Sequence, residues 1–272
     1  MPELPEVETT CRGIAPHLIG RSLGEIIVRD RRLRIPVPID MDRHVGKTVS
    51  SLRRRAKYLI LQLADGEQVL IHLGMSGSLR VCEPHQEPRK HDHVILVLDD
   101  GREVRFHDPR RFGIFLPIGK ASAESHPLLS SLGPEPLEDA FSQATLLAAC
   151  RSRKAAIKLV IMDPKVVVGV GNIYASEALF RAGIRPGTSA QRVSRARLTK
   201  LVDAIKTVLA ESIEQGGTTL RDFVNSNGQP GYFRQRLFVY DRAGEPCRIC
   251  GRAILQATMG QRSTYWCPGC QK

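Results

Sequence analysis

Four cysteines near the C-terminus constrain the fold more than any other feature of the sequence. They form two Cys-x2-Cys pairs, Cys247 with Cys250 and Cys267 with Cys270, and sixteen residues separate the pairs. This spacing is typical of a zinc ribbon, in which four thiolates fill a tetrahedral Zn²⁺ shell. Because a filled shell leaves no position for a substrate, we expect one structural zinc ion. A zinc-stabilised segment that binds another protein is the alternative.

The hydrophobic pattern of the N-terminal half predicts β-strands. From about residue 22 to residue 104 apolar and polar side chains alternate, as in residues 59–63 and 69–73. Asp-Gly pairs at 65–66 and 100–101 lie between such runs and supply the positive φ angles that tight hairpins need. We therefore expect an antiparallel β-sandwich or barrel, ending where two prolines interrupt residues 132–136.

Helical periodicity appears on both sides of these strands. Val7, Cys11, Ile14 and Leu18 recur at helical spacing before them. After the boundary one apolar stripe, flanked by Ser194 as N-cap and by Gly216 and Gly217 as terminators, consists of Leu198, Leu201, Val202, Ile205, Val208, Leu209 and Ile213. The Gly-, Thr- and Asn-rich residues 216–233 suit a mobile loop and an inert surface loop equally well. The sequence thus predicts an α+β protein.

The charge of the chain favours a polyanionic partner. Forty Lys and Arg residues against twenty-eight Asp and Glu residues give a formal net charge of +12. The resulting field attracts nucleic acid, although a basic protein without such a partner remains the alternative. No run of eighteen apolar residues predicts a membrane span, and the start shows no cationic segment followed by an apolar one. We therefore expect a cytoplasmic protein with no membrane partner.

The N-terminal residues Pro2 and Glu3 permit covalent chemistry. A small second residue favours removal of Met1, which would leave the secondary amine of Pro2 beside the carboxylate of Glu3. When a secondary amine condenses with an aldehyde-like carbon, it forms a cationic iminium that promotes elimination from the adjacent carbon. The alternative is a helix start, because proline suits the first helical turn and Glu3 and Glu6 complement the helix dipole. Taken alone, these residues favour the helix start.

Short motifs occur in order along the whole chain. They are residues 1–9 (MPELPEVET), 54–59, 72–77, 90–93, 108–113 (DPRRFG), 132–137, 168–177 (VGVGNIYASE), 216–220, 230–233 and the four cysteines. Together they resemble the bacterial formamidopyrimidine-DNA glycosylases, a helix-two-turns-helix family. The resemblance implies a monomeric, bifunctional DNA glycosylase and AP lyase of base excision repair. Such an enzyme excises 8-oxoguanine and formamidopyrimidines from damaged double-stranded DNA through a Pro2 iminium and β,δ-elimination.

The resemblance also implies a division of the chain and the roles of its catalytic residues. Residues 1–133 would form the catalytic β-sandwich domain, residues 134–237 the helix-two-turns-helix domain with a lesion loop, and residues 238–272 the zinc ribbon. Pro2 would attack the deoxyribose C1′ while Glu3 donates a proton. Lys57 would donate a proton during β-elimination, and Arg262 would act in δ-elimination and bind phosphate. The residues that would support the pocket are Glu6 and His72.

The resemblance further implies how DNA is held. Met75, Arg110 and Phe112 would enter the duplex from the minor groove and fill the gap left by an extruded base. For Met75 or Phe112 alone, packing in the core is the alternative. The other DNA contacts implied are His91, Arg153, Lys158 and Asn172. One departure from the family is Asp241, where glycine is common.

Two other functions are compatible with parts of the sequence. An endonuclease VIII-like glycosylase for oxidised pyrimidines shares the terminal proline, the glutamate and the zinc module, but residues 4–6 and 110–112 favour the purine enzyme. A zinc-ribbon protein that binds DNA without catalysis would use Pro2 only to start a helix.

Overall fold

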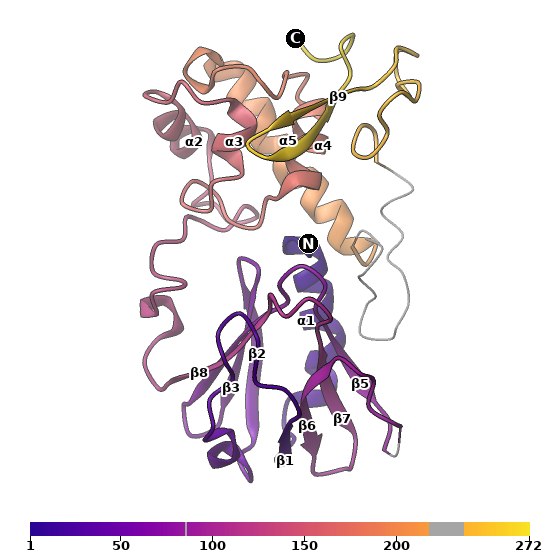
Figure 1. Ribbon diagram of the computed structural model, residues 1–272. Coiled ribbons are helices and arrows are strands. Elements are labelled where there is room, and N and C mark those ends of the chain that lie inside the picture. The colour runs from indigo at the N-terminus through magenta and orange to yellow at the C-terminus, as the bar shows by residue number, and fades with distance from the viewer. Residues whose placement is uncertain (85, 218–236) are drawn as a thin grey trace. The chain divides into compact units, whose positions relative to one another are not determined.

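The computed structural model describes residues 1–84, 86–217 and 237–272, which fall into two compact units (Figure 1). Of the described residues, the first unit contains Met1–Ser130 and 215–217, and the second contains Ser131–Glu214 and 237–272. The motif at 230–233 lies outside the described residues, as does the predicted loop apart from Gly216 and Gly217. Across the described ranges, no helix has both the length and the apolar character needed to cross a membrane.

The first unit is built from two four-stranded antiparallel sheets, with strand orders β1-β6-β7-β5 and β2-β3-β4-β8. The strands are β1 (Leu23–Val28), β2 (Val49–Arg55), β3 (Tyr58–Leu63), β4 (Gln68–His72), β5 (Ser78–Cys82), β6 (Asp92–Leu98), β7 (Glu103–His107) and β8 (Ile114–Gly119). Helix α1 (Leu4–Leu18) contributes Ile14 to the same hydrophobic core as Leu61 of β3 and Leu96 of β6. The predicted β-sandwich with an N-terminal helix is confirmed. Two short 3₁₀ helices, η1 (Met41–His44) and η2 (Ala123–Ser125), lie in its connections.

The two predicted Asp-Gly hairpins are present, with a geometry that differs in detail from the expected tight turns. Only the glycines have positive φ, 89° at Gly66 and 84° at Gly101. The backbone N–H of Leu63 donates to Glu67 O at 2.8 Å, so three residues form the first loop. Such a loop needs left-handed backbone at its last position alone. The preceding aspartates are therefore free to keep negative φ.

Most of the regular secondary structure of the second unit is helical. They are α2 (Gln143–Cys150), α3 (Ile157–Ile161), α4 (Asn172–Arg181), η3 (Ala190–Arg192) and α5 (Arg195–Glu214). Helix α5 begins directly after Ser194, and the predicted apolar stripe is buried against α2 and α4. Gly216 and Gly217 follow its end with φ of 76° and 83°, a conformation that stops a helix and favours glycine. The predicted helix and both of its boundaries are confirmed.

The C-terminal ribbon packs on α4 within this unit. Its hairpin consists of β9 (Leu255–Met259) and β10 (Arg262–Trp266). The buried carboxylate of Glu177 in α4 accepts three backbone N–H groups, from Phe238, Val239 and Tyr240, at 2.8 to 2.9 Å. Burial raises the pKa of Glu177, although these hydrogen bonds partly oppose the rise. Asp241 follows with φ of 60°, a left-handed conformation that favours glycine and that aspartate tolerates better than most residues.

Candidate active site and nucleic-acid interface

A helix does start at this end of the chain: Pro2 precedes α1, and Glu3 lies directly before its first residue, Leu4. The catalytic roles of Pro2 and Glu3 stay a prediction. Glu3 is the N-cap residue and is only 3% exposed. Its backbone N–H donates to Glu6 Oε2 at 2.8 Å, as in a capping box. Gly217 lies against Glu6, because a Cβ added to it would be 3.4 Å from Glu6 Cγ. The helix N-terminus thus fixes the backbone next to Pro2 and places two buried carboxylates there.

Lys57 is half-buried in the two-residue turn between β2 and β3, where Ala56 has φ of 54°. Arg54 ties this turn to α1, since its Nε donates to Glu8 Oε2 at 2.6 Å and its Nη1 donates to Ala56 O at 3.2 Å. Burial raises the pKa of Glu8, but hydrogen bonds from Arg54 and Arg12 outweigh it and hold the pKa below its ordinary value. Helix α1, which Pro2 precedes, therefore also positions the turn that carries Lys57.

His72 lies at the end of β4, where its ring centroid is 4.7 Å from that of Tyr58. Its Nδ1 accepts a hydrogen bond from the Gly74 N–H at 2.9 Å. Burial and, to a lesser degree, the nearby charges of Lys57 and Arg34 lower the pKa of His72 to about 4. The ring is therefore neutral near neutral pH and acts as an acceptor that shapes the turn after β4.

We expect His72 to make the first unit less stable in acid. Between its ordinary pKa of 6.5 and its folded pKa of about 4, the unfolded chain binds a proton that the folded chain does not. The free energy of unfolding must then fall as the pH falls through this window, by at most about 1.4 kcal/mol per pH unit from this group. His72→Gln keeps an acceptor near Gly74 but cannot titrate there. Urea unfolding across this window should show a weaker pH dependence for the variant; an equal dependence would contradict the burial of a neutral ring.

The predicted wedge residues lie on exposed loops. Met75 is 38% exposed and Phe112 is 46% exposed, and Arg110 is exposed beside them. The guanidinium carbon of Arg110 lies 5.2 Å from the centre of the Phe112 ring, which is a cation–π distance. The alternative that Met75 and Phe112 pack in the core is therefore wrong. Exposed apolar groups stacked with a guanidinium can contact nucleobases.

His91 lies next to two other histidines of the same unit. Its ring centroid is 6.0 Å from that of His93 and 5.9 Å from that of His107. Among the described residues, no group is hydrogen-bonded to its buried Nδ1. Burial, followed by the charges of His107 and Lys90, lowers the pKa of His91.

Lys158 and Asn172 come together in the second unit. Lys158 is 0% exposed, and its Nζ donates to Asn172 Oδ1 at 2.6 Å, to Thr264 Oγ1 at 2.7 Å and to Ser263 O at 3.3 Å. Asn172, the first residue of α4, donates to Ser263 O at 2.8 Å. The pair thus joins α3, α4 and β10. Direct contact of Lys158 with phosphate stays a prediction.

Arg262 is exposed at the tip of the ribbon hairpin. The two turn residues before it, Gly260 and Gln261, have φ of 54° and 60°, as a type I′ turn requires. A Cβ on Gly260 would lie 2.6 Å from Leu159 Cδ2. The hairpin tip therefore packs closely on α3, at the residue that follows Lys158. The structure therefore presents the Arg262 side chain to solvent from a fixed hairpin.

Arg153 lies before α3 and is engaged by a carboxylate, with Nη1 2.8 Å from Asp163 Oδ2. Arg153 is half-buried, and nearby basic residues are exposed.

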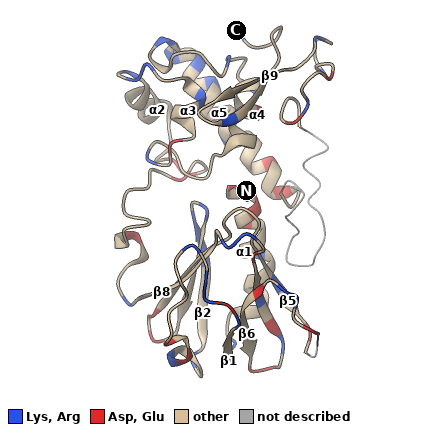
Figure 2. Cartoon of the chain, viewed as in Figure 1, with Lys and Arg blue, Asp and Glu red and all other residues tan. Residues whose placement is uncertain are grey.

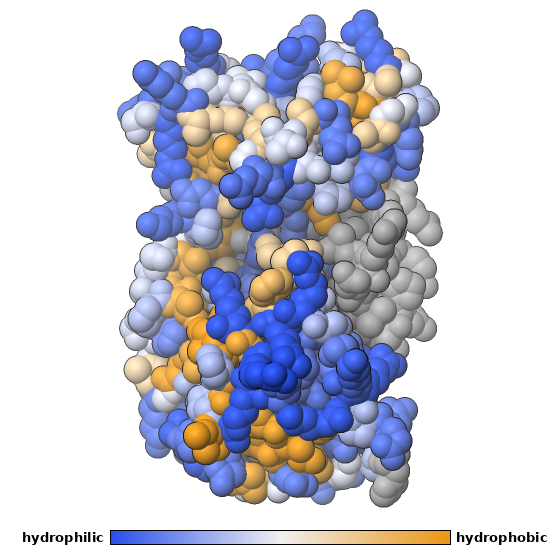
Figure 3. Space-filling model, in the orientation of Figure 1, coloured by the Kyte–Doolittle hydropathy of each residue, from blue (hydrophilic) through white to orange (hydrophobic). Residues whose placement is uncertain are grey.

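Figure 2 shows Lys and Arg residues on both units and acidic residues at the start of α1. On the face drawn in Figure 3, hydrophilic residues cover much of the surface between smaller apolar areas. These surfaces suit a polyanion more than an apolar partner.

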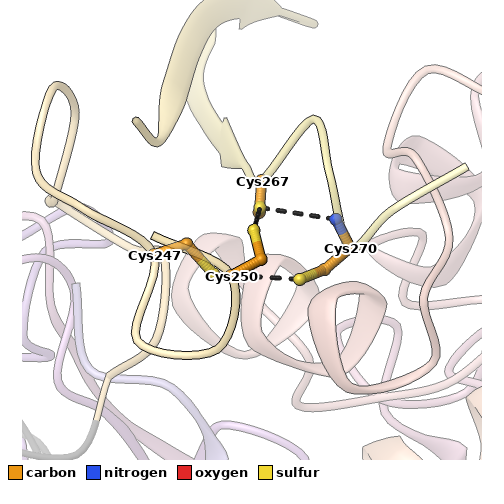
Figure 4. A group of neighbouring side chains, drawn as sticks. All are labelled: Cys247, Cys250, Cys267 and Cys270. Carbon is orange, nitrogen blue, oxygen red and sulfur yellow. Dashed lines mark hydrogen bonds between the residues drawn. The ribbon is translucent and has the colours of Figure 1, made fainter. Parts of the chain in front are cut away.

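The four predicted metal ligands converge on one point (Figure 4). Their sulfur atoms lie within 4.8 Å of one another, with 3.8 Å between Cys247 and Cys270 and 3.4 Å between Cys250 and Cys267. Tetrahedral Zn–S bonds of about 2.3 Å require S–S distances near these values. The N–H groups of Ile249 and Cys270 donate to Cys247 and Cys267 Sγ at 3.4 Å and would stabilise thiolates. The donor set therefore fits one zinc ion with a closed shell.

Zinc removal should unfold the ribbon locally, because zinc binding to such sites is linked to folding by roughly 10 kcal/mol. Trp266, the single tryptophan of the sequence, precedes Cys267 and reports on this region. We expect chelation to change its fluorescence emission and to weaken DNA binding, and added Zn²⁺ to restore both. Cys250→Ser should lose zinc, whereas Cys82→Ser, outside the cluster, should retain it. Unchanged emission and affinity after verified zinc loss would contradict this role.

Comparison with known proteins agrees with this geometry. Three family models match successive parts of the chain: the formamidopyrimidine-DNA glycosylase N-terminal domain at residues 1–115, the H2TH domain of the same glycosylases at residues 132–224, and the zinc finger found in FPG and IleRS at residues 244–272. The last match confirms the predicted zinc ribbon.

Individual relatives extend the similarity to the full length. A formamidopyrimidine-DNA glycosylase of Methylococcus capsulatus is 56% identical, with 100% of both chains covered. Two Lactococcus lactis FPG structures are 29% identical and cover 100% of both chains. One is a mutant bound to Fapy-dG-containing DNA, with a TM-score of 0.93, and the other is the wild type bound to DNA containing an oxidised pyrimidine, with a TM-score of 0.92. With the N-terminal motif, both loops of the predicted wedge and the ribbon all in place, the chain belongs to the formamidopyrimidine-DNA glycosylase family.

Proposed function

We propose that the protein is a bifunctional DNA glycosylase and AP lyase that excises oxidised purines from duplex DNA in base excision repair. The observation that carries this proposal is the start of α1, where Pro2 precedes the buried carboxylates of Glu3 and Glu6. Glu8 of the same helix is bonded to Arg54, which holds the turn of Lys57. A nucleophile and proton-transferring groups are thus carried by elements that are fixed to one another.

Base loss begins when the amine of Pro2, freed of Met1, attacks C1′ of the extruded nucleotide. The N–C1′ bond forms, the glycosidic bond breaks, and its electron pair leaves with the base, which takes a proton. The C1′–O4′ bond then breaks, Glu3 donates a proton to the ring oxygen, and the nitrogen lone pair forms the iminium. The nitrogen loses its own proton on the way, so charge and atoms balance.

Strand cleavage follows because the cationic iminium withdraws electrons and so promotes elimination from the adjacent carbon. The C2′ proton is lost and the 3′ phosphate leaves by β-elimination, and a second elimination then expels the 5′ phosphate. Lys57 donates a proton during the first elimination. Arg262 binds phosphate and assists the second, a role supported by its exposure at the hairpin tip. The zinc ion takes part in no step, since its four thiolates only hold the ribbon.

The exposed loops of the first unit would keep the target base out of the stack. Extrusion of a base costs a few kcal/mol, and a wedge that fills the gap offsets part of this cost. Met75 and Phe112 supply apolar surface, and Arg110 can donate hydrogen bonds to the orphaned cytosine. Phosphate would be gripped by His91, Arg153, Lys158 and Asn172.

We further propose the arrangement and location of this activity. Residues 1–133 carry catalysis, residues 134–237 bind DNA and contain the lesion loop, and residues 238–272 form the ribbon. The protein acts as a monomer in the bacterial cytoplasm, associated with the nucleoid through its DNA binding.

The lesion class needs a direct test, because the Lactococcus lactis FPG was crystallised as a mutant with Fapy-dG DNA and as the wild type with DNA containing an oxidised pyrimidine. The second candidate is therefore an endonuclease VIII-like preference for oxidised pyrimidines. Duplexes with 8-oxoguanine opposite cytosine or with thymine glycol opposite adenine should be incubated with the zinc-loaded protein under single-turnover conditions. We expect faster incision of the 8-oxoguanine duplex. Faster incision of the thymine glycol duplex would favour the second candidate, and binding without incision of either would overturn the enzymatic proposal.

A further inference from the structure

The two loops that carry the predicted wedge residues meet at one buried carboxylate. Asp108 is 0% exposed, and each of its oxygens accepts one hydrogen bond from a different loop. Ser76 Oγ donates to Oδ1 at 2.8 Å, and the Gly113 N–H donates to Oδ2 at 2.7 Å. Ser76 follows Met75, and Gly113 follows Phe112. Asp108 therefore connects the neighbours of two wedge residues without being exposed itself.

The third wedge residue is joined to the same group through Ser76. The backbone N–H of Arg110 donates to Ser76 Oγ at 3.3 Å, so this hydroxyl bridges Arg110 to the carboxylate. Gly74 completes the contact between the loops, because a Cβ there would lie 2.5 Å from the backbone carbon of Phe112. Met75 is thus flanked by Gly74 and Ser76, both of which are fixed to the loop of Arg110 and Phe112.

The loop of Arg110 and Phe112 is held in a conformation that needs such anchors. Arg111, between them, has φ of 59°, which is costly for a residue other than glycine. Its N–H donates to Asp108 O at 3.2 Å, and its guanidinium lies 2.6 Å from Asp30 Oδ2. Gly113 is also sterically constrained, since a Cβ would be 2.9 Å from Asp108 Oδ2. The strained backbone places Arg110 and Phe112 on the same side, where they stack.

The backbone of Asp108 extends these links to the histidine segment. Its N–H donates to His91 O at 3.0 Å, and its carbonyl oxygen is 2.9 Å from the ring Nε2 of His93. Every predicted DNA-contacting residue of the first unit therefore lies at, or next to, a residue bonded to Asp108 or to Ser76.

We propose that Asp108, acting through Ser76, is a positioning residue that sets the spacing of the wedge and thereby the discrimination of the base opposite the lesion. This inference rests on the proposed function. Arg110 can distinguish the opposite base only if its guanidinium is held at a fixed distance and angle from that base. The buried carboxylate of Asp108 supplies this constraint, because it fixes the Ser76 hydroxyl to which the Arg110 N–H donates. Loosening it should affect recognition of the opposite base more than chemistry at C1′, to which Pro2 belongs.

The substitution that tests this role best is Asp108→Asn, because asparagine has the same shape as aspartate. In Asp108→Asn one oxygen can still accept from Gly113, but an NH₂ group then faces Ser76. The serine hydroxyl loses its acceptor, and its oxygen must now accept from both the new amide and Arg110. Ser76→Ala removes the same bond from its other end. Ser76→Ala also removes the acceptor of the Arg110 N–H. Because the link between residues 76 and 108 is already lost in Ser76→Ala, the double variant should be no worse than Ser76→Ala alone.

The experiment measures single-turnover incision of 8-oxoguanine opposite cytosine and opposite adenine. In the wild type the rate opposite cytosine should exceed the rate opposite adenine, and we expect the ratio of these two rates to fall about tenfold in each variant. One buried charge-assisted hydrogen bond can have an effect of this size. Borohydride trapping on a preformed abasic site should change less than about twofold, since the wedge is not needed for attack on an exposed C1′. Ser78→Ala, a change at a buried serine two residues from Ser76, is the matched control and should leave both readouts unchanged.

The possible outcomes distinguish a failure of the proposed role of Asp108 from a failure of the proposed glycosylase activity. If the wild type incises and both variants keep the wild-type ratio, the positioning role of Asp108 is wrong and the proposed function stands. If the wild type incises neither duplex, the proposed function falls and the inference with it. Circular dichroism of each variant shows whether it is folded, and Ser76→Ala provides the decisive result if Asp108→Asn does not fold.

Discussion

Replacing Pro2 by glycine should lower the yield and rate of borohydride-trapped complex with lesion-containing DNA by at least about 100-fold, a loss of roughly 3 kcal/mol of transition-state stabilisation. Glycine leaves a primary amine, whose imine with the sugar must be protonated before it withdraws electrons as strongly. It also removes the ring that fixes the direction of the nitrogen lone pair. Helix α1 starts at Leu4, so the substitution should leave the fold intact.

Pro5→Ala provides the matched control. Pro5 lies in the first turn of α1, is buried like Pro2 and carries no free amine. Alanine is well tolerated at a helix N-terminus, so this variant should trap DNA as the wild type does. Equal losses in both variants would mean that Pro2 acts through the helix rather than as a nucleophile.

Replacing Glu3 by glutamine should reduce base excision by about 10² to 10⁴-fold, the range expected when a positioned general acid is lost. Glutamine has the size of glutamate, and the backbone N–H of residue 3 can still donate to Glu6. Its amide cannot deliver a proton to the leaving base or to the ring oxygen. Cleavage at a preformed abasic site should fall much less, because the base is already absent and the hemiacetal ring of the abasic sugar opens to its aldehyde in water without a protein acid.

The measurement is single-turnover incision of two duplexes, one with 8-oxoguanine and one with an abasic site, analysed on denaturing gels. Glu25→Gln, at an exposed position in β1, is the control for loss of one negative charge and should act as the wild type. Excision at the wild-type rate by Glu3→Gln would exclude Glu3 as the proton donor.

Local periodicity was sufficient to predict the two longest helices of the described residues and part of the sheets. Helices α1 and α5 have apolar residues at helical spacing and recognisable ends, and the alternating runs at residues 59–63 and 69–73 correspond to β3 and β4. The cysteine spacing alone indicated the ribbon. The helical and strand periodicities depend on neighbours within a few residues. The ribbon was recognised from two such local cysteine pairs and the length of the segment between them.

The anchors of the candidate site could not be predicted in this way, because their partners are distant in sequence. Glu8 and Arg54 are separated by 46 positions, and Ser76 and Asp108 by 32. Lys158 is buried because Thr264, 106 positions later, accepts its hydrogen bond. A lysine that is predicted from sequence to contact phosphate can therefore also be an internal link in the fold.

The exposure of the wedge residues also depended on tertiary structure. Methionine and phenylalanine are most often buried, and nothing in the residues near Met75 or Phe112 reverses that expectation. The two loops are shaped by the close approach of Gly74 to Phe112 and by the left-handed backbone at Arg111, and both side chains lie at the surface. The loops could be recognised as functional only through the resemblance to the family.

The most direct test of the covalent mechanism is peptide mapping of the borohydride-reduced complex by mass spectrometry. Active, zinc-loaded protein should be trapped on 8-oxoguanine DNA, digested with protease and nuclease, and its N-terminal peptide sequenced. We expect the reduced sugar fragment on the nitrogen of Pro2, in a peptide that lacks Met1. A fragment attached instead to Lys57, or active protein that retains Met1, would contradict the proposal that Pro2 is the nucleophile.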